Sequence, residues 1–105
     1  MIFARGLLNK IQTYFGKQDL IDAIKKTIEL LEDSEDSDWS NFTAIEIKEI
    51  LQGELYKIEN NQEFDKLELA VLFAVTGNVQ ETAMRNDWHA EYLKIADVID
   101  KYTER

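Results

Sequence analysis

Few side chains in this sequence have the types and spacing that catalysis or metal binding needs. His89 is the single histidine of the 105 residues, and Glu91 follows it by two positions, so the two side chains diverge on a helix and make a poor metal site. The chain has no cysteine, no Gly-x-Ser-x-Gly turn and no glycine-rich phosphate loop. We therefore expect no enzyme, no catalytic residue and no cofactor.

The acidic run from Asp33 to Asp38 is the one segment that suggests calcium. An EF-hand loop that starts at Asp33 needs glycine at its sixth position and glutamate at its twelfth. The sequence has Asp38 and Ala44 at those positions. The run is therefore not an EF-hand, and we expect no metal site.

Glu54 is the one carboxylate with an unusual expected position. At about 100° per residue, it falls within the apolar arc of a helix that starts at Ala44, an arc formed by Ile47, Ile50, Leu51 and Ile58. An ionised carboxylate is costly there unless it is paired or reaches solvent. We expect Gly53 to distort the last turn so that Glu54 reaches solvent. The alternative is a functional site in which burial raises the carboxyl pKa.

The charge of the chain is unevenly distributed. The net charge is −9, yet residues 29–68 hold three basic and thirteen acidic side chains, a net of −10, while residues 1–28 carry +3 and residues 69–105 carry −2. Such a surface repels nucleic acid, which is bound through Lys and Arg, and attracts a basic protein. The alternative is that the acidity serves only to keep the protein in solution.

Two neighbouring segments are candidates for the partner-binding surface. On the helix from Ala44, the side chains of Ile45, Glu49 and Tyr56 fall within an arc of about 40°, on the face opposite the expected core, and Glu46 and Gly53 border them. An aromatic anchor with a charged rim is typical of a binding hot spot. The predicted contact residues are Asp33, Glu35, Asp36, Asp38, Trp39, Glu46, Glu49 and Tyr56. Alternatively, both faces of this helix pack, and Trp39 plugs the end of a bundle.

The spacing of apolar residues predicts one all-α domain over residues 1–105, a compact bundle of five to six helices with short loops. A short amphipathic helix over residues 1–16, ending at Gly16, is expected to pack on the core rather than on a membrane. A second helix is expected to start near Asp19, a good N-cap. The polar composition of the acidic segment after it predicts a loop.

The caps place the remaining helices. Thr43 with Glu46 forms a capping box, and Asp65 with Glu68 repeats that spacing, which predicts helices over about 44–58 and 66–75. Residues 69–75 of the second helix are apolar all round, so we expect it to be a central buried helix. Asn78 is expected to cap a short turn through Met84, and Asp87 to cap a last helix. One face of that helix contains Trp88, Tyr92, Ile95, Ala96, Ile99 and Tyr102.

No apolar stretch approaches the length of a membrane span, and residues 1–10 lack the long apolar run of a signal peptide. We expect a cytoplasmic protein that interacts with neither membrane nor nucleic acid. The sequence does not indicate an oligomeric state.

A pattern in the C-terminal third resembles a known family. The segments 72–81 and 86–96 resemble a stretch of the small acidic immunity proteins of bacterial toxin–immunity systems, including polymorphic toxin and contact-dependent growth inhibition systems. The pattern is matched at Leu72, Phe73, Ala74, Thr76, Gly77, Gln80, Glu81, Asn86, Trp88 and Ala96. Val75 replaces a proline of the pattern and Asp87 replaces a glycine. We expect the matched positions to be mainly architectural.

The resemblance implies a function as well as a fold. Immunity proteins of this kind are not enzymes; they bind a cognate toxin domain in the cytosol and block its active site or its substrate surface. Many such toxins are nucleases with basic grooves, which an acidic inhibitor would cover. The alternative that the residues leave open is a helical regulatory or adaptor domain that binds an endogenous protein or self-associates.

Overall fold

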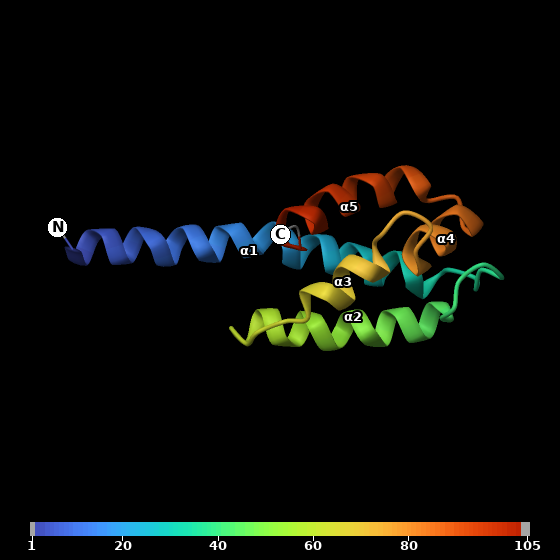
Figure 1. The fold of residues 1–105 in the computed structure, drawn as a ribbon, viewed down its shortest axis with the longest axis horizontal. Coiled ribbons are helices and arrows are strands. Elements are labelled where there is room, and N and C mark those ends of the chain that lie inside the picture. Colours follow the sequence, from blue (N-terminus) through green and yellow to red (C-terminus); the bar gives the residue numbers. More distant parts are fainter. Residues whose placement is uncertain (1, 104–105) are drawn as a thin grey trace.

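The computed structural model describes residues 2–103 of the chain, and the side chains of residues 17–103. It consists of the helices α1 (Ile2–Glu32), α2 (Ala44–Glu59), α3 (Lys66–Leu72), α4 (Asn78–Arg85) and α5 (His89–Thr103), and the described residues form no strand (Figure 1). The predicted all-α architecture is confirmed, and the number of helices lies within the expected range.

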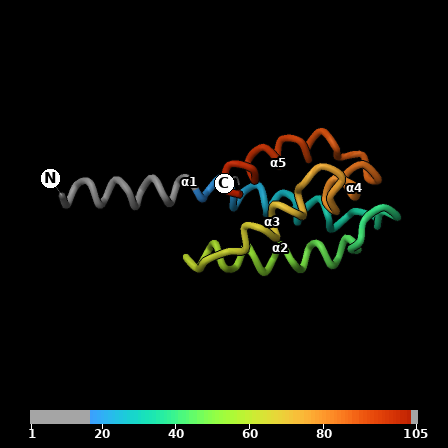
Figure 2. Tube along the Cα trace, in the orientation of Figure 1, coloured from blue at the N-terminus to red at the C-terminus, as the bar shows by residue number. Residues whose placement is uncertain are grey.

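The second half of α1 forms the centre of the bundle. It packs against α2 on one side and α5 on the other, while α3 and α4 pack against α5, as the Cα trace also shows (Figure 2). Each of these helices contributes an apolar stripe, as helical spacing requires. The fully buried side chains of the core include Leu20, Ile24, Ile47, Leu51, Ile58, Leu69, Leu72, Val79 and Ile99.

Asp19 does not cap a second helix, because Lys17 and Gln18 before it already belong to α1. Its carboxylate instead accepts a hydrogen bond from the Tyr102 hydroxyl and lies 3.7 Å from the Lys101 ammonium. These contacts join α1 to the end of α5. The predicted end of a first helix at Gly16 is wrong, because α1 runs without interruption from Ile2 to Glu32. The predicted packing of residues 1–16 on the core lies outside the side chains that the structure describes.

The Tyr102–Asp19 hydrogen bond makes stability depend on pH. Burial first, and then the hydrogen bond to Asp19 and its charge, raise the pKa of Tyr102 to about 12. Since the unfolded chain releases this proton near pH 10, the contribution to stability is complete below pH about 10 and is lost as the pH rises towards about 12.

We therefore expect Tyr102→Phe to lower the free energy of unfolding by about 1 kcal/mol at neutral pH, because a hydrogen bond to a half-exposed carboxylate is lost. The difference between wild type and variant should shrink between pH about 10 and 12. Urea denaturation at both ends of that range measures it. A difference that grows with pH would contradict the assignment.

The two predicted caps of α2 and α3 are confirmed. The Thr43 hydroxyl accepts from the Glu46 amide at 3.1 Å, and the Glu46 carboxylate accepts from the Thr43 amide at 2.9 Å, which completes the capping box. Asp65 accepts from the Glu68 amide at 2.9 Å. Both helices start where the sequence predicts, because these hydrogen bonds are local.

α3 differs from the expectation in length and in position. The helix ends at Leu72. Its residues Leu67 and Val71 are 60% and 58% exposed, and Val75, which follows the helix, is 80% exposed. The prediction of a central buried helix is therefore wrong, because α1 occupies the centre and α3 lies on the outside, with Leu69 and Leu72 alone among its residues buried.

The end of α3 is set by a close approach. A Cβ on Gly77 would lie 2.8 Å from the carbonyl oxygens of Val71 and Ala74, so only glycine fits here. The Gly77 amide donates to the Ala74 carbonyl at 2.8 Å, and Tyr92 of α5 donates its hydroxyl to the Phe73 carbonyl at 2.7 Å. The chain therefore turns sharply here and begins α4.

Two other predicted caps are wrong. Asn78 is the first residue of α4, with Gly77 as N-cap, and Asp87 has φ 62° and lies two residues before α5. An N-cap needs extended backbone, which Asp87 does not have; aspartate tolerates the left-handed region where the resembling family has glycine. The predicted face of α5 is confirmed, with Trp88, Tyr92, Ile95 and Ile99 buried.

Candidate partner-binding surface

The acidic loop between α1 and α2 (residues 33–43) is held in place by side chains of α4 and of the connection between α4 and α5. The Asn86 side chain accepts from the Glu35 amide and donates to the Glu35 carbonyl, both at 2.7 Å. The Trp88 indole N–H donates to the Ser34 hydroxyl at 3.0 Å. Asn86 and Trp88 thus fasten this end of the loop, a contact that the sequence did not indicate.

The other end of the loop is fastened as well. The Asp36 carboxylate accepts from the Ala44 amide at 2.8 Å, at the start of α2. The Asn78 side-chain oxygen accepts from the Ser40 hydroxyl at 3.1 Å and from the Asn41 amide at 2.8 Å. Since hydrogen bonds fasten both ends, the loop is preorganised before any partner binds. Its composition alone indicates a loop but not these contacts.

All eight predicted contact residues are exposed: Asp33, Glu35, Asp36, Asp38, Trp39, Glu46, Glu49 and Tyr56. Three of the acids already have partners within the chain. Glu35 pairs with Arg85 at 2.5 Å, Asp36 binds the start of α2, and Glu46 belongs to the capping box. Within residues 17–103, no ion pair engages the carboxylates of Asp33, Asp38 or Glu49. These three carboxylates are available to a cationic partner.

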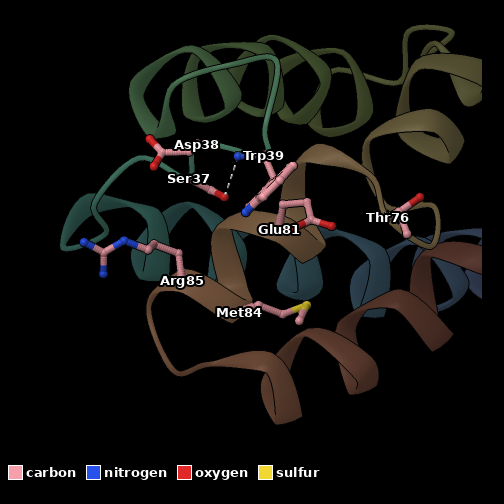
Figure 3. Close-up of a pocket in the computed structure, with 7 residues that line it drawn as sticks. All are labelled: Ser37, Asp38, Trp39, Thr76, Glu81, Met84 and Arg85. Atoms are coloured by element: carbon pink, nitrogen blue, oxygen red, sulfur yellow. Dashed lines mark hydrogen bonds between the residues drawn. The ribbon is translucent and has the colours of Figure 1, made fainter.

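Trp39 is the most exposed large apolar side chain of the described residues, at 83%. Its amide donates to the Ser37 hydroxyl at 3.2 Å, which directs the indole over α4 (Figure 3). It borders an open groove of about 600 Å³, here called the Trp39 groove, lined by Ser37, Asp38, Trp39, Thr76, Glu81, Met84 and Arg85. The expectation that Trp39 plugs the bundle is therefore excluded.

The outward face of α2 is also exposed, with Ile45 at 66% and Tyr56 at 61%. A Cβ on Gly53 would meet nothing within 4 Å. Tyr56 lies eleven positions after Ile45, which corresponds to about 16 Å along the helix. The predicted contact residues therefore form two areas: the loop with Glu46 and Glu49 at one end of α2, and Tyr56 towards the other end.

Glu54 is buried, with 3% exposure, and it stays within α2. The expectation that it escapes to solvent is wrong. One carboxylate oxygen accepts from the Asp65 amide at 2.8 Å, and the other lies 3.1 Å from the Lys57 ammonium. The charge is tolerated because both oxygens have partners. Glu54 thereby connects α2 to the start of α3.

His89 takes part in a hydrogen-bonded chain. The Thr76 amide donates to the side-chain oxygen of Gln80, so the Gln80 amide group faces His89 and donates to Nε2 at 3.1 Å. The imidazole also stacks on Tyr92, with 5.7 Å between ring centroids. These contacts fix the turn before α4 against the start of α5. Within residues 17–103, no group of three acidic or imidazole side chains is placed to hold a metal ion.

Several exposed apolar residues near the loop were missed by sequence reasoning. Leu67 and Val71 lie in α3, Val75 follows it, Phe42 lies in the loop and Met84 lies in α4; their exposures are between 37% and 80%. The signal was present in the sequence, because residues 69–75 are apolar all round. An all-apolar run predicts core residues, because periodicity does not distinguish a face buried in the core from one that a partner covers.

None of the described helices is both long enough and apolar enough to cross a membrane. The chain was compared with protein-family models, with curated proteins and with solved structures, and none of these comparisons gives a match.

Proposed function

We propose that the chain is an immunity protein of a bacterial toxin–immunity system, which binds a basic toxin domain in the cytoplasm and covers its substrate surface. A nuclease is the toxin class that presents such a basic groove. The protein performs no chemistry in this scheme; it competes with the substrate for the same cationic side chains. The acidic loop and the Trp39 groove form the contact surface.

The observation that supports this proposal most is the position of Trp39. The indole is 83% exposed, and the loop that carries it is fastened at both ends. An exposed aromatic side chain on a preorganised segment costs little further entropy on binding. The neighbouring carboxylates of Asp33 and Asp38 have no ion pair within the described residues, so they add negative potential around the anchor.

The charges and the aromatic side chain have different effects on binding. Exposed carboxylates at the rim speed association with a cationic partner, and salt screens the effect. A large apolar anchor that becomes buried slows dissociation, which is where most affinity differences arise. The proposal therefore predicts separate kinetic effects for the two kinds of residue.

Reversal of the three available acids, Asp33→Lys, Asp38→Lys and Glu49→Lys, is expected to lower the association rate about tenfold or more at low salt, because steering is lost. The candidate partner for this measurement is the product of the adjacent gene. Co-purification with the chain and loss of that product's toxicity test whether it is the partner. Stopped-flow binding at several salt concentrations measures the rate.

The matched control reverses three exposed acids of α5, Glu91, Asp97 and Asp100, which changes the net charge equally on another helix. The control should slow association much less. An equal loss in both variants would assign the effect to net charge alone and contradict the placement of the surface. An unchanged rate in both would contradict steering altogether.

A second candidate function is supported by the outward face of α2. Ile45 and Tyr56 are exposed there, apart from the Trp39 groove, as in a regulatory or adaptor domain that binds an endogenous protein or self-associates. Concentration-dependent dimerisation in sedimentation equilibrium, abolished by Tyr56→Ala, would favour this function over the first.

A further inference from the structure

The outward face of α3 carries apolar side chains that the bundle leaves uncovered. Leu67 and Val71 lie four residues apart, on the same face of the helix, and are 60% and 58% exposed. The opposite face is buried through Leu69 and Leu72. A contiguous apolar surface of this kind marks a binding site more often than a single exposed residue does.

These side chains border a groove between α2 and α3, here called the α3 groove. Its volume is about 340 Å³, and its lining is Phe42, Ile50, Asp65, Leu67, Glu68, Val71, Leu72 and Asn78. Most of the lining is apolar, with the two acids from the start of α3. The groove has room for a few apolar side chains of a partner, and it is too open to enclose a small molecule.

The residues that line the α3 groove include two acids, Asp65 and Glu68, and no cation. Burial, together with the hydrogen bond and charge of Glu54 and the charge of Asp65, raises the pKa of Glu68. Lys57, the nearby cation, is already paired with Glu54 at 3.1 Å. Three carboxylates thus face one ammonium group. A further positive charge at this edge would be stabilised by Glu68 and Asp65.

The α3 groove is continuous with the loop that forms the proposed toxin contact. Asn78 lines the groove, and its side-chain oxygen accepts from Ser40 and Asn41. Trp39 precedes this pair of residues, and Thr76 of the Trp39 groove precedes Asn78 by two positions. The two grooves are therefore lined by neighbouring residues of this loop and of the turn before α4, so that a single partner can cover both.

We infer that the α3 groove binds an amphipathic helix of the toxin domain, with apolar side chains four residues apart in the groove and a lysine or arginine on Glu68 and Asp65. This inference rests on the proposed function for the identity of the partner. Helix-in-groove recognition supplies the affinity through the apolar contacts, and the acidic edge selects a basic helix over an acidic one.

The first test uses the toxin. Val71→Asp and Leu67→Asp place a charge in the groove and should weaken toxin binding at least about tenfold, since each removes apolar contact and adds an unpaired charge. The matched control is Leu93→Asp on α5, where the side chain is 51% exposed and lies outside the groove. Circular dichroism should show all three variants folded, because the replaced side chains are exposed. Equal affinities of all three variants would overturn the inference.

The second test needs no toxin. A short helical peptide with leucines four residues apart and flanking lysines is titrated into the isotopically labelled full chain, beside a peptide with glutamate in place of each lysine. Amide signals of residues 65–72 should shift when the lysine peptide is added. The glutamate peptide should bind with about tenfold lower affinity. No shift in these signals would overturn the groove assignment.

The two tests separate the possible failures. If wild-type protein neutralises no toxin but the lysine peptide binds the groove, the proposed function fails and the groove's preference for a basic helix stands. If Val71→Asp abolishes self-association instead of toxin binding, the groove is an interface between copies of this chain, and the inferred occupant is wrong.

Discussion

Replacement of Trp39 by alanine is expected to weaken toxin binding by about 2–4 kcal/mol, the usual cost of truncating an aromatic hot spot. The dissociation rate should carry most of the change, since the proposed function makes the indole an anchor that becomes buried on binding and not a source of steering. The free energy of unfolding should change by no more than about 0.5 kcal/mol, because the side chain is 83% exposed. Surface plasmon resonance and urea denaturation measure the two quantities.

Tyr56→Ala is the matched control for this experiment. Tyr56 is also an exposed aromatic residue, at 61%, and it lies about 16 Å along α2 from Ile45, towards the far end of the helix. Its truncation should change toxin affinity much less than that of Trp39. If Tyr56→Ala weakened toxin binding more than Trp39→Ala, the contact surface would be the outward face of α2. The proposed contact of the Trp39 groove with the toxin would then be wrong.

Replacement of Asn86 by alanine is expected to lower the free energy of unfolding by about 2–3 kcal/mol. Its side chain makes three hydrogen bonds: two to the backbone of Glu35 and one, at 2.8 Å, to the Thr82 carbonyl. Each such bond is worth about 1 kcal/mol net. The loss also releases one end of the acidic loop, so the loop must be ordered again when it binds, which should weaken toxin affinity.

Asn60→Ala supplies the comparison for Asn86. The Asn60 side chain makes one hydrogen bond, to the Tyr56 carbonyl at 2.7 Å, on an exposed helix end. Loss of this hydrogen bond should lower the free energy of unfolding by less than about 1 kcal/mol. Hydrogen exchange at the amides of residues 33–43 separates the two variants: it should accelerate in Asn86→Ala and not in Asn60→Ala. Unchanged exchange in both would show that Asn86 does not hold the loop.

The two variants test different requirements of the same surface. Trp39→Ala removes the anchor and leaves the loop in place, whereas Asn86→Ala leaves the anchor and loosens the loop. The resembling pattern includes Asn86 and Trp88, which hold Ser34 and Glu35 in position. Asn86 therefore supports the loop, and the loop carries the exposed indole of Trp39.

Local features were predicted well from the sequence. The capping box at Thr43 and the cap at Asp65 depend on hydrogen bonds that span three residues, so the sequence contains all the groups involved. The apolar face of α5 and the exposure of the acidic residues likewise follow from periodicity and charge. Features of this kind need no knowledge of the neighbouring helices.

The misplaced features depend on contacts between distant segments. Asp19 binds Tyr102 across 83 positions, and Asn78 binds Asn41 across 37, so neither acts as the cap that its local sequence suggests. Glu54 stays buried because the Asp65 amide, eleven positions away, meets its carboxylate. Local spacing cannot indicate such partners, since they exist only once the helices have packed.

Local patterns along the chain are enough to indicate the helical class, the starts of α2 and α3, and a cluster of negative charge in residues 29–68. Which apolar surfaces are covered depends on how the helices pack. Residues 69–75 are all apolar, and yet Val71 and Val75 face solvent because α1 occupies the centre of the bundle. A hydrophobic side chain is stabilised equally by its own core and by a partner, so composition alone leaves that choice to the packing.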